Sequence, residues 1–142
     1  MHLLRVVSDA GGERALDRLA TDELRSLLLG AKGTGPETAD DILLYAFQRP
    51  VFVIDAYTRR LLGRLGWADG TEGYEALRSG MEKACGGDLA MMQELHALIV
   101  HHAKVVCRKQ PLCALCPLRR SCEAFRKRDS HVAASPTGGK MR

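Results

Sequence analysis

Apolar residues recur at helical spacing along most of the chain, and short loops rich in glycine or proline separate these segments. Leu24, Leu27 and Leu28 form one apolar stripe, and Gly30 ends it. The same spacing predicts further helices over about 37–47, 56–65, 74–84 and 89–106. The run at 51–54 has strand propensity, but a single strand would have no partner, so we interpret it as a buried connector. The pattern therefore predicts an all-α fold.

The pattern also predicts helix ends and side-chain directions. We expect Thr21 to cap the helix that it precedes, with acidic residues in the first turn, where they suit the helix dipole. Helix 56–65 should turn its leucines inward and its arginines outward, namely Arg59, Arg60 and Arg64. We expect Tyr57 and Trp67 in the core. On the long helix over 89–106, we expect packing or surface roles for His96, His101 and His102.

The composition suits a globular protein that could meet nucleic acid. Of its 142 residues 46% are hydrophobic, which is enough for a core, and aromatic residues make up only 5%. The net charge of +4 is compatible with DNA or RNA without identifying either. No apolar run approaches the ~20 residues that span a bilayer, and the start, Met1-His2-Leu3-Leu4, is unlike a signal peptide. We expect a soluble, cytoplasmic protein that is not bound to a membrane.

Four of the five cysteines crowd into 16 residues with the pattern Cys107-x5-Cys113-x2-Cys116-x5-Cys122. A tight cluster of this kind indicates metal binding rather than disulfides. Four thiolates can hold tetrahedral zinc or an iron–sulfur cluster. Zinc sites usually show two close pairs, whereas only the middle pair is close here, so the spacing favours a [4Fe–4S] cluster over zinc. Cys85 stands apart, and we expect it to be an ordinary buried cysteine.

Basic residues accompany the cysteine segment. Arg108 and Lys109 follow the first cysteine, and clustered on a metal-held loop they suit phosphate contacts. We divide the chain into a helical domain over 1–106, the cysteine loop over 107–125 and a basic tail over 126–142. The tail is rich in serine, proline and glycine beyond its basic start, so we expect disorder there.

A glycine turn and a lone aspartate are the strongest candidates for chemistry. Gly33-Thr34-Gly35 lies between two helical segments, where exposed backbone N–H groups can hold a phosphate. Asp55 comes 20 residues after Gly35 and directly follows the apolar connector. We expect Asp55 to cap the next helix and to lie near whatever the turn holds.

Together these features resemble the endonuclease III superfamily of helix–hairpin–helix DNA glycosylases, over roughly residues 3–125. The features are the hairpin with its Gly-x-Gly-x-x-Thr-Ala pattern, the Val-Ile-Asp run and the C-terminal four-cysteine loop. The resemblance implies a partial helical barrel that binds damaged double-stranded DNA as a monomer associated with the nucleoid. It implies that Gly33, Thr34 and Gly35 hold a DNA phosphate, often with a monovalent cation. Asp55 matches the catalytic aspartate, and the cysteines match the ligands of a largely structural [4Fe–4S] cluster.

The sequence also differs from endonuclease III at positions that restrict the reaction we expect. Glu37 stands where endonuclease III itself has a lysine that forms a Schiff base, so we expect a monofunctional glycosylase. The surrounding sequence is most similar to the endonuclease III-like 3-methyladenine glycosylases, which implies excision of an alkylated base. The alternatives are an endonuclease III-type glycosylase and abasic-site lyase, or a non-catalytic DNA-binding module. Glu37 and Tyr57 are weaker candidates for the base pocket, and Glu37 also suits a surface position. Family members carry further helices before the equivalent of Leu3, so we expect an N-terminally truncated chain.

Overall fold

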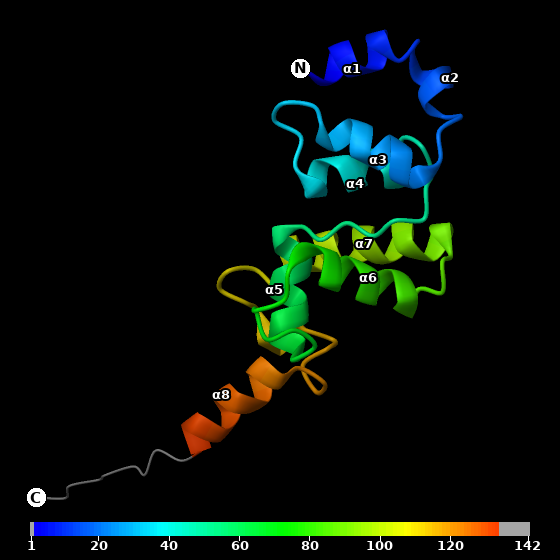
Figure 1. The fold of residues 1–142 in the computed structure, drawn as a ribbon. Coiled ribbons are helices and arrows are strands. Elements are labelled where there is room, and N and C mark those ends of the chain that lie inside the picture. The colour runs from blue at the N-terminus through cyan, green and yellow to red at the C-terminus, as the bar shows by residue number, and fades with distance from the viewer. Residues whose placement is uncertain (1, 134–142) are drawn as a thin grey trace, which may run out of the picture. The chain divides into compact units, whose positions relative to one another are not determined.

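The computed structural model describes residues 2–133, and within that range every regular element is a helix (Figure 1). The all-α prediction is therefore confirmed. The chain divides into two compact units: Met1–Asp55 with Glu72–Leu98, and Ala56–Thr71 with Ile99–Arg142. None of the helices in the described range is long and apolar enough to cross a membrane.

The first unit contains a helical hairpin and the buried connector. Its helices are α1 (Leu3–Asp9), α2 (Glu13–Leu16), α3 (Thr21–Leu29), α4 (Pro36–Tyr45), α6 (Tyr74–Ala84) and the first part of α7 (Leu89–Val105). Helices α3 and α4 pack side by side (Figure 1). Their apolar stripes meet because leucines recur every three or four residues, and Leu24, Leu28, Leu43 and Leu44 are almost fully buried.

The run at 51–54 is a buried connector, as the sequence indicates. All four of its side chains are buried, and none of these residues is in a helix or a strand. Two side chains of α6 satisfy its backbone. The N–H of Phe52 donates to Glu82 Oε1 at 3.0 Å, and the N–H of Ile54 donates to the Tyr74 hydroxyl at 3.4 Å. The segment that carries Asp55 is thus held in place by α6.

The second unit contains α5 (Ala56–Leu65), the end of α7, a short 3-10 turn η1 (Cys113–Leu115) and α8 (Glu123–Ala133). Helix α5 packs against α8. The prediction of a disordered tail from 126 is wrong for 126–133, which are helical. Glu123 lies in the first turn of α8 and pairs with Lys127 one turn later, and both features favour a helix. The rest of the predicted tail, 134–142, lies outside the described residues.

Three local predictions are also wrong. Ala20, not Thr21, precedes the first turn of α3, where the Glu23 carboxylate accepts the N–H of Ala20 at 3.0 Å. Trp67 is 72% exposed, because it lies just beyond the end of α5 and not on its apolar stripe. Arg60 and Arg64 do not point to solvent. They donate hydrogen bonds to backbone carbonyls at the start of the cysteine segment.

Candidate functional site

The glycine turn is a tight link between α3 and α4. The N–H of Thr34 donates to the carbonyl of Ala31 at 3.1 Å, which closes the turn. Gly33 has a φ of 88°, a conformation that side chains disfavour. Gly35 instead has a φ of −88° and a ψ of 178°, and it caps α4, which begins at Pro36.

The outer face of this turn is open. A Cβ added at Gly33 or at Gly35 would meet no atom within 4 Å. Within the described chain, the N–H groups of both glycines lack a backbone acceptor. Since neither φ nor internal packing requires glycine at position 35, its missing side chain suits a close approach from outside. The turn presents exposed donors at the N-terminus of α4, an arrangement that favours an anion.

Asp55 is buried, with only 9% of the residue exposed, and it faces a histidine from α7. Its Oδ2 lies 3.6 Å from Nε2 of His96, and Nδ1 of His96 lies 2.7 Å from the Tyr45 hydroxyl on α4. The edge of the Phe52 ring also packs against His96, with ring centroids 6.1 Å apart. Burial, together with the charges of Asp41 and Asp55, raises the pKa of Tyr45, so its hydroxyl keeps its proton. The carboxylate thus lies beside two polar rings.

The sequence identified Asp55 as a candidate but assigned no functional role to His96 or Tyr45. The available signal was weak. His96 falls on the same α7 stripe as the buried Met92 and Ile99, where a polar residue is unusual. Spacing along one helix cannot reveal which carboxylate such a histidine faces.

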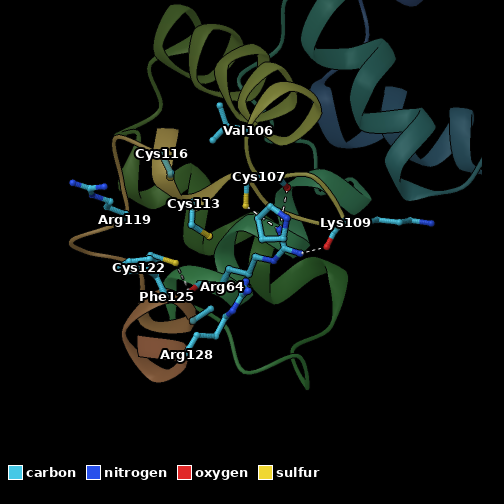
Figure 2. Close-up of a pocket in the computed structure, with 12 residues that line it drawn as sticks. Arg64, Val106, Cys107, Lys109, Cys113, Cys116, Arg119, Cys122, Phe125 and Arg128 are labelled. Atoms are coloured by element: carbon cyan, nitrogen blue, oxygen red, sulfur yellow. Dashed lines mark hydrogen bonds between the residues drawn. The ribbon is translucent and has the colours of Figure 1, made fainter. Parts of the chain in front are cut away.

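The four clustered cysteines line one cavity of about 270 Å³ in the second unit. Figure 2 shows the sulfur atoms of Cys107, Cys113 and Cys122 facing the same space, with Arg64 beside it. None of the four forms a disulfide with another described residue. The four cysteines of the predicted ligand set thus lie around one cavity.

Two arginines of α5 hold the start of the cysteine loop. Arg64 donates from Nη1 to the carbonyl of Cys107 at 3.1 Å, to its Sγ at 3.1 Å and to the carbonyl of Arg108 at 2.7 Å. Its Nη2 donates to the carbonyl of Lys109 at 3.0 Å. Arg60 Nε also reaches the carbonyl of Cys107 at 3.0 Å.

The chemistry of the four thiols suits either an iron–sulfur cluster or zinc. No three histidine, cysteine or acidic side chains of the described residues lie close enough to hold a single metal ion. Thiolates are soft ligands suited to zinc or iron–sulfur centres.

The remaining candidates lie at the surface or beside basic groups. Glu37 is exposed in the first turn of α4. Tyr57 is half-buried, and Arg60 and Lys104 lie over its ring, 5.3 and 5.5 Å from the centroid. Arg108 and Lys109 have exposed side chains, as phosphate contacts require, while their carbonyls bind Arg64.

Known proteins with similar sequences include a DNA repair glycosylase by name and several endonucleases III. A protein of Methanocaldococcus jannaschii, named as a candidate DNA repair glycosylase, is 42% identical over 119 residues, which are 82% of this chain and 54% of that protein. Endonuclease III of Thermotoga maritima is 29% identical over 129 residues, 90% of this chain and 56% of that one. No family model matches the chain.

The fold agrees with these relatives. A solved structure described as a non-covalent endonuclease III–DNA complex matches with a TM-score of 0.72 at 23% identity, and covers 89% of this chain and 56% of that one. The chain belongs to the endonuclease III superfamily of helix–hairpin–helix DNA glycosylases. It spans about half the length of the curated superfamily members that it matches.

Proposed function

We propose that this member of the endonuclease III superfamily excises an alkylated base from double-stranded DNA by hydrolysing the N-glycosidic bond. The observation that carries the proposal is the buried Asp55, which lies in the same compact unit as the open glycine turn. The turn would bind a phosphate of the DNA backbone, and Asp55 would promote hydrolysis of the N-glycosidic bond of a base flipped out of the duplex.

Asp55 is suited to stabilise the reacting sugar. Breaking an N-glycosidic bond builds positive charge on the sugar, and a nearby carboxylate stabilises that charge. The same carboxylate can orient and deprotonate the attacking water. An alkylated purine is already cationic and leaves readily, so this reaction needs no strong general acid.

Glu37 supports hydrolysis without strand cleavage. A lyase attacks the sugar with an amine, and the carboxylate of Glu37 cannot form the resulting Schiff base. Glu37 is exposed in the first turn of α4, so a surface role suits it better than a place in the base pocket.

The cysteine cavity supplies the proposed cofactor site. Cys107, Cys113, Cys116 and Cys122 would hold a [4Fe–4S] cluster, which stabilises the loop and takes no part in the hydrolysis. Arg108 and Lys109 would contact DNA phosphates, and the glycine turn would hold a monovalent cation that supplies positive charge beside the phosphate. We propose that the protein acts as a monomer, in the cytoplasm and on the nucleoid.

The test is base excision by the purified protein. Duplex DNA containing 3-methyladenine should release the base, and Asp55→Asn should abolish release while leaving the helical circular dichroism unchanged. Asp22→Asn is the matched control, because Asp22 is exposed in the first turn of α3. Normal DNA binding with no excision by the wild type would instead indicate a non-catalytic DNA-binding module.

A lyase is the second candidate, because several relatives are named endonuclease III and another is named as an N-glycosylase/DNA lyase. Borohydride trapping distinguishes the lyase from the monofunctional glycosylase, since only a Schiff-base intermediate becomes a covalent protein–DNA adduct.

The proposed cofactor needs a separate test. Anaerobically purified protein should contain iron and show the visible absorption of an iron–sulfur cluster, whereas stoichiometric zinc without iron would contradict it.

A further inference from the structure

We propose that His96, oriented by Tyr45, is a positioning residue that fixes the carboxylate of Asp55. This inference rests on the catalytic role proposed for Asp55 and adds two residues to it. The three side chains come from α4, the buried connector and α7, and all of them belong to the first compact unit. Neither His96 nor Tyr45 would touch the substrate in this role; both would act through Asp55.

The burial of His96 calls for a partner at each ring nitrogen. The residue is 7% exposed, so water cannot satisfy its nitrogens freely. The Tyr45 hydroxyl satisfies Nδ1 at 2.7 Å. Nε2 is fully buried and makes no hydrogen bond within the described residues, and the Asp55 carboxylate lies 3.6 Å away. Leaving a buried nitrogen unsatisfied costs about 1–3 kcal/mol, and a small movement of either side chain would form the hydrogen bond.

The same geometry fixes where the proton of the neutral ring lies. A lone pair on Nε2 would face the negative carboxylate, which is unfavourable in a buried site. A proton on Nε2 instead points toward Asp55, and Nδ1 then accepts from the Tyr45 hydroxyl. Tyr45 is a suitable donor although the residue is 42% exposed, because desolvation and the charges of two nearby aspartates raise the pKa of its hydroxyl.

This arrangement would orient Asp55 for the reaction. The Nε2–H would hold Oδ2 at one angle, and Tyr45 would stop the imidazole from rotating. The connector beneath is held by Glu82 and Tyr74, so both the backbone and the side chain of Asp55 would be fixed. A carboxylate preset in this way loses less entropy when the reacting sugar arrives.

The first experiment is independent of activity. Nitrogen-15 NMR of the full chain, labelled at histidine, should show His96 at neutral pH as the Nε2–H tautomer. Tyr45→Phe should remove the hydrogen bond at Nδ1 and mix the tautomers, and Asp55→Asn should change the Nε2–H signal. The exposed His101 should be unchanged in both variants and serves as the internal control. An Nδ1–H tautomer in the wild type, or an Nε2 signal that ignores Asp55→Asn, overturns the inference.

The second experiment measures rate. Glutamine can place an amide N–H near the position of Nε2, whereas asparagine is too short to do so. His96→Gln should therefore keep excision near the wild-type rate, and His96→Asn should lose roughly 10–100-fold in single-turnover rate at unchanged DNA affinity. Equal losses in both variants would indicate a merely structural histidine. His101→Asn should leave the rate unchanged.

The two hypotheses fail in different ways. Absent excision by the wild type would reject the proposed function, while the tautomer measurement would still decide whether His96 faces Asp55 as a donor. Excision that depends on Asp55, combined with the wrong tautomer, would reject only the role of His96.

Discussion

Arg25 on α3 holds Asp40 on α4 in a two-point ion pair. Nε lies 2.6 Å from Oδ1 and Nη2 lies 3.0 Å from Oδ2, and the Asp40 side chain has no exposed surface. Arg25 also donates to Glu75 of α6 at 2.7 Å, which pairs in turn with Arg78 at 2.9 Å. Hydrogen bonding to Asp40, the largest influence, raises the pKa of Arg25. The pair thus ties the two hairpin helices to the helix that holds the connector.

Breaking this pair should destabilise the fold strongly. Arg25→Met leaves the Asp40 carboxylate buried without its main partner, and the expected loss is about 3–5 kcal/mol in the free energy of unfolding. Urea denaturation followed by circular dichroism measures it. The double variant Arg25→Met with Asp40→Leu should recover part of the loss, since it removes the buried charge as well. A loss no larger in Arg25→Met than in Lys127→Met, which breaks a surface pair, would contradict the role assigned to Arg25.

The positions of the helices could be predicted, because they follow from the regular spacing of apolar residues. Leucine spacing located α3, α5 and α6, and Pro36 located the start of α4. It did not identify the burial of Asp40, although that residue lies one turn before Leu44 on the buried face of α4. A charged residue on an apolar face can be recognised from the sequence. Its partner lies 15 positions away, and the spacing of apolar residues does not indicate which distant residues come into contact.

The same distinction applies to the candidate site: residues in local sequence motifs could be predicted, and contacts between distant residues could not. The cysteine spacing and the glycine turn are local patterns, so Cys107 and Gly33 could be selected from the sequence. Arg64 could not, because an arginine on an amphipathic helix usually faces solvent, and only the folded loop supplies the carbonyls that turn it inward. His96 gave a faint signal as a polar residue on an apolar stripe, without indicating Asp55.

Cys85 should make folding stability depend on pH in the alkaline range. Burial, with a smaller effect of Asp88, raises the pKa of its thiol above the ordinary value of 9.0. A raised pKa in the folded state means that the stabilisation is present below about pH 9 and is lost as the pH rises through the folded value. Unfolding free energies at pH about 7 and about 10 should therefore differ more in the wild type than in Cys85→Ala. Identical pH slopes would show that the buried thiol contributes nothing.

Arg64 should stabilise the cysteine loop and whatever centre it holds. Arg64→Met removes donors to three backbone carbonyls and to the Cys107 sulfur, so the loop carbonyls lose their partners. We expect faster loss of iron on exposure to a chelator, followed by the decay of the visible absorption. Arg119→Met is the matched control, because Arg119 lines the same cavity but, among the described residues, makes a single long hydrogen bond, of 3.4 Å, to Ala114. Equal rates of iron loss in the two variants would reject the role of Arg64.

The glycine turn allows folding and DNA binding to be separated. Gly33→Ala should cost about 1 kcal/mol of stability, because its φ of 88° is strained for alanine. Gly35→Ala should fold normally, since its φ is −88° and an added Cβ meets no atom. Its methyl group would nevertheless stand where a DNA phosphate must approach, so affinity for duplex DNA should fall at least tenfold, which corresponds to about 1.4 kcal/mol.

Gly73 provides the control for that prediction. It caps α6 with an extended backbone and open space around its Cα, as Gly35 does for α4, but it lies outside the hairpin. Gly73→Ala should leave DNA affinity unchanged in a fluorescence anisotropy titration at fixed salt. Because the two substitutions add the same methyl group at equivalent helix caps, any difference in affinity reports the approach of DNA to the hairpin. Wild-type affinity in Gly35→Ala would mean that the phosphate is held elsewhere.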